Sequence, residues 1–292
     1  MNDLMGDETA RYAYCGKVFR RQERNSDRAS EYLQVGYEIF DGADVVKSDT
    51  DAFCIIKEAL GDLPLRIVTG DIGILMAAVL GLKTTDRRKR ALLRHIWRPK
   101  RFITTLENFT NDLSSSTERF DDFDEETSFD KHAKEIGLRS KSEVIKRIEN
   151  LLLDGKAAPI STTERGVLNS LLNIGEKCPQ ALIQLKALLP DMPALKSAIE
   201  KFERRLSALD KANVDLSVID FEISYGRTSM EYYDGFVFGF YSENNINLPP
   251  IATGGRYDAL TKQIGKGREI PAVGGVVRPD LILQSKGFED ND

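Results

Sequence analysis

The alternation of apolar and polar positions predicts two strands near the start of the chain. Residues 12–19 and 32–40 are rich in aromatic and β-branched side chains, and the strongly polar residues 20–31 separate them. Short runs of this composition, bounded by polar clusters, are typical of strands. The simplest arrangement is an antiparallel pair joined by a long charged loop.

Helical spacing follows the two strands. Residues 49–60 place apolar side chains three or four positions apart, and Gly61 ends the pattern. An uninterrupted apolar run at residues 65–69 is typical of a buried strand, and a second apolar helix is expected over residues 74–82. The first part of the chain therefore mixes helices and strands.

A long helical block is expected in the middle of the chain. From about residue 85 to residue 210 the alternation typical of strands is missing, and an acidic, serine-rich stretch at residues 111–130 predicts a surface loop within the block. Near its end, apolar residues at steps of four, three, four and three lie along one helix face; they are Leu195, Ile199, Phe202, Leu206 and Leu209. This spacing indicates a helical insertion.

Two serines mark helix starts within this block. Ser140 and Ser161 are each followed three positions later by a glutamate, Glu143 and Glu164. In such capping boxes the serine hydroxyl and the glutamate carboxylate accept hydrogen bonds from backbone N–H groups that have no partner within the helix. We therefore expect helices to begin directly after both serines.

Strand patterns return after the insertion. They occur at residues 215–224 and 232–241 and in two glycine-rich segments, 253–258 and 271–275. These late strands have to pair with the early ones across the helical block. The prediction is an α+β fold, an antiparallel sheet with flanking helices and a helical insertion over about residues 85–210, rather than an alternating doubly wound fold.

Composition narrows the classes of function. The 41 Lys and Arg residues against 46 Asp and Glu give a net charge of −5, which disfavours general nucleic-acid binding. The longest apolar stretches, such as residues 72–82, are much shorter than the roughly 20 residues that cross a bilayer. The start of the chain is too polar for a signal peptide, so we expect no membrane partner and a cytoplasmic location.

The cysteines and histidines give no sign of a metal site. Cys15, Cys54 and Cys178 are widely spaced, and only His95 and His132 are available as further ligands. Neither a disulfide framework nor a zinc site has this pattern. We therefore expect no metal and no cofactor.

One strand carries a face of polar side chains. Gln34, Gly36 and Glu38 lie on the same side of the strand over residues 32–40, because side chains alternate along a strand. Gly36 is expected to leave space between an amide and a carboxylate, which suits a small polar ligand. An ordinary edge strand with solvated polar residues is the alternative interpretation.

Five short motifs occur in a fixed order along the chain. They are Phe19-Arg20, Gln34-x-Gly36-x-Glu38, Tyr232-Tyr233-x-Gly235-x-Val237-Phe238, Gly254-Gly255-Arg256-Tyr257-Asp258 and Pro271-Ala272-Val273-Gly274. In this order they resemble the catalytic core of the class II histidyl-tRNA synthetases and of their paralogue, the regulatory subunit of ATP phosphoribosyltransferase. The resemblance covers most of the chain outside the helical block. It implies one class II aminoacyl-tRNA synthetase-like domain over residues 1–292.

The resemblance implies a pocket for histidine. Gln34 and Glu38 are expected to face the α-amino group of the ligand, and Tyr233 and Tyr257 to contact its imidazole side. A pair of glycines allows the backbone to approach closely. The residues that the resemblance assigns to histidine binding are Arg20, Gln34, Glu38, Tyr232, Tyr233, Gly254, Gly255 and Tyr257.

The resemblance also implies that contacts with ATP are damaged. A glutamate that helps to hold ATP in the synthetases is Gln22 here, the arginine ahead of the paired tyrosines is Thr228, and the arginine of the last motif is Leu281. Adenylyl transfer depends on such cations to stabilise developing negative charge. We therefore expect no catalytic residue and a loss of synthetase activity.

Two nearby arginines are not expected to replace the missing ones. Arg227 is one position from Thr228, and on a strand that offset points to the opposite face. Arg278 lies three positions before Leu281, but Pro279 restricts the backbone between them.

The resemblance bears on the ends of the chain as well. Only residues 1–11 precede the strand that leads into the first motif, so the segment that forms the usual dimer interface of the family is expected to be short. No anticodon-binding domain is expected, and without one tRNA recognition has no evident platform.

These implications favour a non-catalytic regulatory subunit. It is expected to bind L-histidine, to form a homodimer within a hetero-oligomer, and to be required for activity and histidine feedback of the short-form catalytic subunit of ATP phosphoribosyltransferase, in the first step of histidine biosynthesis. One alternative is a divergent histidyl-tRNA synthetase or free-standing adenylate-forming enzyme. Another is a free-standing histidine-binding module.

A basic run at residues 87–101 stands outside these motifs. It is expected to be a solvated helix face beside the acidic residues 121–126, and a patch for a protein partner or RNA is the alternative.

Overall fold

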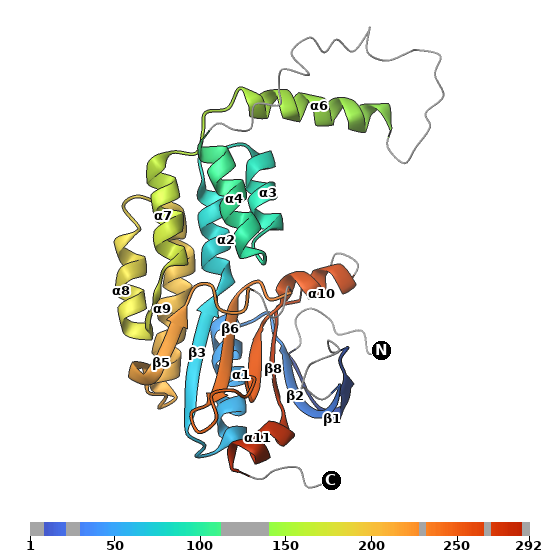
Figure 1. The fold of residues 1–292 in the computed structure, drawn as a ribbon, viewed down its shortest axis with the longest axis vertical. Helices are drawn as coiled ribbons and strands as arrows, with labels where there is room; N and C mark the ends of the chain where they lie inside the picture. Colours follow the sequence, from blue (N-terminus) through green and yellow to red (C-terminus); the bar gives the residue numbers. More distant parts are fainter. Residues whose placement is uncertain (1–8, 22–29, 112–139, 228–231, 266–269, 288–292) are drawn as a thin grey trace.

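An eight-stranded mixed sheet organises the part of the chain that the structure describes. The computed structural model describes residues 9–21, 30–111, 140–227, 232–265 and 270–287, and Figure 1 shows the sheet with a block of helices standing at one end of it. The strands, in their order across the sheet, are β1 (Ala10–Phe19), β2 (Glu31–Phe40), β8 (Ala272–Val277), β7 (Ala252–Arg256), β6 (Phe236–Ser242), β3 (Leu65–Asp71), β5 (Ile219–Glu222) and β4 (Gly175–Lys177).

The first and last strands pair, as the sequence predicts. β2 lies between β1 and β8, and it is antiparallel to both. In this register Glu38 is opposite Tyr12 on one side and Gly274 on the other. This confirms the predicted α+β fold, in which strands before and after the helical insertion belong to one sheet.

Three details of the sheet differ from the prediction. β3 and β5 are parallel, because the helical block between them acts as the long crossover that a parallel pair requires. β4 lies inside the block expected to be wholly helical; its three residues are too few to show alternation. The strand expected over residues 232–241 begins only at Phe236, so Tyr232 and Tyr233 lie in the loop before it.

Helices surround the sheet and form the block. They are α1 (Val45–Leu60), α2 (Ile72–Gly81), α3 (Asp86–Arg94), α4 (Pro99–Thr110), α6 (Lys141–Gly155), α7 (Thr162–Leu172), α8 (Cys178–Ala187), α9 (Lys196–Lys211), α10 (Asp258–Ile264) and α11 (Pro279–Ser285). Both predicted capping boxes are present, at Ser140 and Ser161. Helix α1 starts four residues earlier than expected, because Asp44 caps it by accepting a 3.0 Å hydrogen bond from Lys47 N–H.

The hydrophobic core lies between the sheet and the helices. Phe53 of α1 packs against the rings of Phe236, Phe238 and Phe240, with centroid separations of 5.3 to 6.3 Å. The predicted apolar stripe of α9 is buried along its whole length. Each such side chain contributes about 1.5–3 kcal/mol by leaving water, so the helical block is an integral part of this core.

Some expectations fall outside the described residues. The predicted acidic loop is described only at residue 111, and neither Gln22 nor Thr228 is described. Over the described ranges no helix has both the length and the hydrophobicity needed to cross a bilayer. Within the same ranges no three His, Cys, Asp or Glu side chains converge as a group of metal ligands.

Candidate functional site

The polar face predicted on β2 lies beside a floor of glycines. Glu38 is opposite Gly274 of β8, and Gly274 is opposite Gly255 of β7. A Cβ atom on Gly274 would lie 1.6 Å from Glu38 Oε2, and one on Gly255 would lie 2.8 Å from the ring of Tyr233. The floor is built of glycine because the functional side chains lie directly on the backbone.

Glu38 and Tyr257 form the polar centre of the site. The hydroxyl of Tyr257 donates a 2.5 Å hydrogen bond to Glu38 Oε2. Burial raises the pKa of Glu38, and the hydrogen bond from Tyr257 opposes part of this rise. Burial and the charge of Glu38 raise the pKa of Tyr257 in turn. The phenol therefore stays protonated and remains a donor to the carboxylate.

Aromatic rings form a wall beside this pair. The Tyr232 ring lies 4.6 Å from that of Tyr233 and 6.1 Å from that of Tyr257, centroid to centroid. Tyr233 is buried, whereas Tyr232 is 40% exposed. The indole N–H of Trp97 donates to the Tyr233 carbonyl at 3.2 Å, which connects the wall to the helical block. Burial raises the pKa of both Tyr232 and Tyr233.

Tyr14 is a site residue that sequence reasoning missed. Its hydroxyl accepts a 3.0 Å hydrogen bond from Gln34 Nε2, and its ring lies over Gly36, where a Cβ would be only 2.2 Å away. The space expected above Gly36 is therefore not open, because Tyr14 fills it. Tyr14 pairs with Gly36 across the two strands. The sequence could have indicated this role, because the predicted hairpin allows an aromatic residue to lie opposite a glycine on the neighbouring strand.

The structure brings most of the predicted histidine-binding residues together, with two qualifications. Arg20 is exposed at the end of β1, and its positive charge acts to lower the pKa of Tyr232 against the larger effect of burial. Gly254 is apart from the others, since a Cβ there would lie 2.2 Å from the ring of Phe238 in the core. The two glycines therefore face opposite sides of the sheet: Gly255 belongs to the floor of the site, and Gly254 faces the core.

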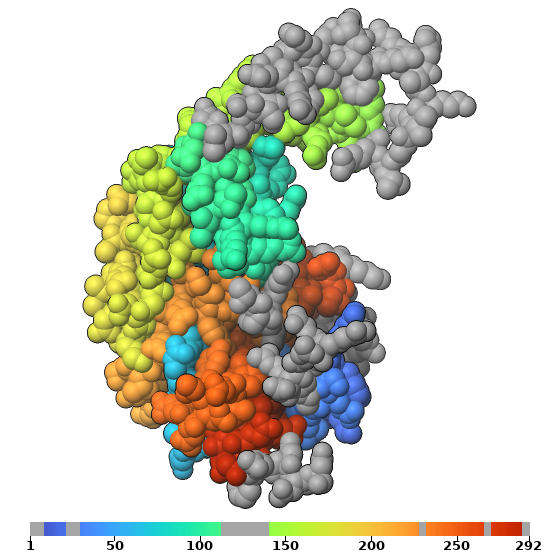
Figure 2. Space-filling view, in the orientation of Figure 1, coloured from blue at the N-terminus to red at the C-terminus, as the bar shows by residue number. Residues whose placement is uncertain are grey.

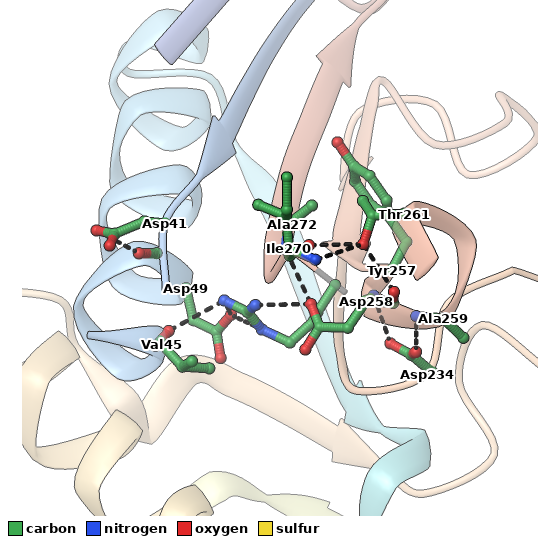
Figure 3. Close-up of polar contacts among 12 residues, drawn as sticks. Asp41, Val45, Asp49, Asp234, Tyr257, Asp258, Ala259, Thr261, Ile270 and Ala272 are labelled. Carbon is green, nitrogen blue, oxygen red and sulfur yellow. Dashed lines mark hydrogen bonds and ion pairs between the residues drawn. The ribbon is translucent and has the colours of Figure 1, made fainter. Parts of the chain in front are cut away.

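Buried ion pairs hold the backbone on both sides of Tyr257. The preceding residue, Arg256, binds Asp49 of α1 through Nη2 at 2.7 Å and Asp258 through Nη1 at 2.9 Å. Asp258 also accepts a 2.8 Å hydrogen bond from the backbone N–H of Ala272, as Figure 3 shows. These bonds join α1, β7 and the start of β8. The orientation of Tyr257 toward Glu38 is therefore set by the core.

The same network reaches the helical block through Arg205 of α9. Arg205 binds Asp49 at 2.9 Å and Asp71 at 2.8 Å, and its guanidinium lies 4.4 Å from the Phe236 ring centroid. Sequence reasoning assigned no role to Asp49 or Arg205. The available signal was the position of Arg205, three residues after Phe202, on the apolar stripe of α9.

The arginines near the expected ATP contacts bind elsewhere. Arg227 is buried in a turn, where its Nε donates to the Ile96 carbonyl at 2.5 Å and its guanidinium lies over Phe102. The expectation based on alternating strand faces does not apply, because residues 223–227 are not a strand. Arg278 donates to the Pro250 carbonyl at 3.3 Å and lies over the ring of Tyr32.

The geometry suits a small ligand that carries an ammonium group and a planar ring. Glu38 supplies a half-buried carboxylate, Tyr257 and Gln34 supply hydrogen-bonding groups, and the aromatic wall supplies ring faces. A cation next to a carboxylate and aromatic faces is stabilised by both.

The fold and this site define a class II aminoacyl-tRNA synthetase-like protein. The solved structures that share the fold include an ATP phosphoribosyltransferase regulatory subunit/histidyl-tRNA synthetase from Bacillus halodurans, with a TM-score of 0.60, 20% identity, and 94% of this chain covered. Histidyl-tRNA synthetase from Nostoc sp. PCC 7120 gives a TM-score of 0.58 at 14% identity, with 99% of this chain covered. The chain spans only 58% and 57% of those two structures.

Sequence comparison then identifies the family. The family model described as histidyl-tRNA synthetase matches residues 1–158 and 141–282. ATP phosphoribosyltransferase regulatory subunits of Brucella ovis and Brucella abortus are each 31% identical over 304 aligned positions, which cover 95% of this chain and 77% of the relative. The chain belongs to the histidyl-tRNA synthetase family, in its branch of ATP phosphoribosyltransferase regulatory subunits.

Proposed function

We propose that this chain is the non-catalytic regulatory subunit of an ATP phosphoribosyltransferase. In this proposal it is required for the activity of a short-form catalytic subunit and makes that activity respond to L-histidine, in the first step of histidine biosynthesis in the cytoplasm. The names and the coverage of the Brucella relatives support the role. The subunit acts as a homodimer within a hetero-oligomer.

One observation carries the proposal. Arg227 and Arg278, which lie beside the family's ATP-contacting positions, are engaged with backbone carbonyls, while the Glu38–Tyr257 pair and its aromatic wall are intact. Within the described residues a ligand site would be kept, while the arginines beside the ATP-contacting positions are engaged elsewhere and would not stabilise adenylyl transfer. Regulation by ligand binding is the function that such a site supports best.

The proposed ligand is L-histidine. Its α-amino group would face Glu38 and Gln34, and its imidazole would lie along Tyr233 and Tyr257, with Arg20 and Tyr232 at the rim. Binding would change the activity of the catalytic chain only if histidine favours one of two assembly states over the other.

Reconstitution tests the partner. The purified chain is mixed with the short-form ATP phosphoribosyltransferase catalytic chain of the same organism, and copurification and transferase activity are measured with and without histidine. We expect a stable complex and a gain of activity on mixing. A failure of the two chains to associate would rule the proposal out.

Two further assays separate the alternatives. ATP–pyrophosphate exchange with histidine is expected to be undetectable, and measurable exchange would instead indicate a divergent synthetase. Calorimetry with histidine is carried out first on this chain alone and then on its mixture with the catalytic chain. A regulatory subunit is expected to bind both histidine and the catalytic chain, whereas a free-standing histidine-binding module would bind histidine only.

A further inference from the structure

A basic groove lies between α3 and α6, away from the site described above. Its volume is about 510 Å³, and its lining consists of Arg87, Arg90, Ala91, Arg94, Glu143, Lys146, Arg147, Asn150 and Leu151. Figure 2 shows α6 projecting from the helical block, with the surface hollowed beneath it. A volume of roughly 300–1,000 Å³ is usual for small-molecule sites.

The groove is formed by one stripe of residues from each helix. On α3 the lining residues are spaced by three, one and three positions, and on α6 by three, one, three and one. Such spacing places side chains on a single helix face. The two basic stripes therefore face each other, with Ala91 and Leu151 adding apolar surface. Arg90 and Arg94 of α3 are exposed, in line with the solvated helix face that the sequence predicts, and the acidic residues 121–126 expected beside that face lie outside the described residues.

One end of the groove is fixed by ion pairs at Asp154. This buried carboxylate accepts a hydrogen bond from Arg88 Nε at 3.1 Å and also binds Arg87 and the hydroxyl of Thr85. Arg88 donates further to the Ala158 carbonyl at 2.8 Å. The junction holds α6 against α3 at this end. It also means that Arg87 already has an ion-pair partner, which it shares with Arg88.

Four cations in the groove are not neutralised in this way. Arg90, Arg94, Lys146 and Arg147 form no ion pair with any carboxylate in the described part of the chain. Glu143, the acidic residue of the lining, is held by the backbone N–H of Ser140 at 2.8 Å. Like charges at positions i and i+4, such as Arg90 and Arg94, cost a helix about 0.2–0.5 kcal/mol.

We propose that this groove binds a small anion that carries two or more phosphate groups. Arginine forks bind phosphate oxygens with paired, charge-assisted hydrogen bonds, and lysine adds a point charge. Four cations that form no ion pair within the described residues match the charge of a diphosphate or triphosphate, and the groove is large enough to hold one.

Calorimetry on the full chain tests the proposal, with sodium tripolyphosphate and sodium phosphate as the probes. We expect tripolyphosphate to bind with a Kd on the order of 10–100 μM and phosphate to bind at least tenfold more weakly. The double variants Arg90→Gln/Arg94→Gln and Lys146→Gln/Arg147→Gln are each expected to weaken tripolyphosphate binding about tenfold or more. Their melting temperatures should stay close to that of the parent chain, since these side chains form no ion pair with the residues that the structure describes.

A matched control removes the same charge elsewhere. Arg204→Gln/Lys211→Gln, on exposed positions of α9, should leave the affinity unchanged. Absence of binding would overturn the proposal, and so would an equal loss in the control, which would show attraction by overall charge alone. An acidic peptide or RNA oligonucleotide that binds the groove residues more tightly than tripolyphosphate would overturn it too, because the site would then belong to a macromolecule.

Discussion

Tyr257 and Glu38 are separated by 219 positions in the sequence, yet the hydroxyl of Tyr257 lies 2.5 Å from a carboxylate oxygen of Glu38. The contact exists because β8 lies between β2 and β7 and carries a glycine, Gly274, directly beside Glu38. On the other side, Arg256 and Asp258 fix the backbone of Tyr257 through buried ion pairs. The positions of Glu38 and Tyr257 therefore depend on the pairing of β2, β8 and β7 and on the ion pairs beside Tyr257.

Removing the hydroxyl of Tyr257 is expected to weaken histidine binding. In Tyr257→Phe, Glu38 loses its donor while the aromatic wall is kept, and a hydrogen bond to a charged group contributes about 1.5–3 kcal/mol. Calorimetry at neutral pH should show a loss of affinity of roughly tenfold or more. Tyr241→Phe is the control, because it removes a tyrosine hydroxyl bonded at 3.2 Å to Tyr225 outside the site. An equal loss in both variants would contradict a direct role for Tyr257.

The raised pKa of Glu38 predicts that the proposed binding of histidine depends on pH. Burial disfavours the ionised carboxylate, but the ionised form is the one that attracts an α-amino group. Affinity should therefore fall as the pH drops through the pKa of Glu38, which lies above the ordinary glutamate value of 4.5. Isothermal titrations between neutral and acidic pH would measure this, and an affinity that stays constant as the pH falls to the ordinary glutamate value would contradict it.

The same pKa shift predicts an opposite effect on stability. The folded chain binds the proton of Glu38 more tightly than the unfolded chain does, so ionisation of Glu38 costs stability as the pH rises. Glu38→Gln should raise the melting temperature at pH 8 by about 2 °C, a shift on the order of 1 kcal/mol or less, while histidine binding is lost. The gain should vanish in acid. Glu200→Gln, at an exposed position of α9, should show neither effect.

Arg205 is expected to be essential for stability. In Arg205→Met, Asp71 loses its ion-pair partner and Asp49 keeps only Arg256. Leaving a buried charge without its partner costs about 3–5 kcal/mol, and urea unfolding should show a decrease of this size. Arg204→Met changes the neighbouring exposed arginine of the same helix and should cost less than about 0.5 kcal/mol. Similar losses in the two variants would refute a specific role for the ion pairs.

Local patterns predicted much of the fold, and long-range contacts account for what they missed. The hairpin strands, the capping boxes and the stripe of α9 depend on neighbours within a few positions, so periodicity and residue type were sufficient. Tyr14, in contrast, became a site residue through the β1–β2 register, and Arg205 through a carboxylate 156 positions away. No local pattern contains either relationship.

The candidate site residues came from the resemblance to a family. The pair Gly254 and Gly255 shows that such a resemblance does not fix the role of each residue. The motif places Gly254 and Gly255 together, but neighbouring residues of a strand face opposite sides of the sheet. Gly255 lies under Tyr233, whereas Gly254 lies against Phe238. A shared motif therefore does not distinguish residues that bind a ligand from residues that pack in the core.

Glu164 offers a test in which the sign of the pH effect is reversed relative to Glu38. Burial alone would raise the pKa of this carboxyl, but hydrogen bonds from the backbone N–H of Lys83 at 2.6 Å and from Ser161 lower it overall. The ionised form of Glu164 therefore stabilises the folded chain above the ordinary glutamate pKa of 4.5, and this contribution is lost as the pH falls through the lowered value. Glu164→Gln should cost about 1–2 kcal/mol at pH 7.

The glutamate of the other capping box, Glu143, is a matched control for Glu164. Glu143 occupies the same position in the capping box of α6, where it is exposed and accepts a 2.8 Å hydrogen bond from the backbone N–H of Ser140. Glu143→Gln should therefore cost well under 1 kcal/mol. Urea unfolding of both variants at pH 7 and pH 3 would measure the difference, which should shrink toward acid. A difference that keeps its full size as the pH falls would show that Glu164 acts through its shape and not through its charge.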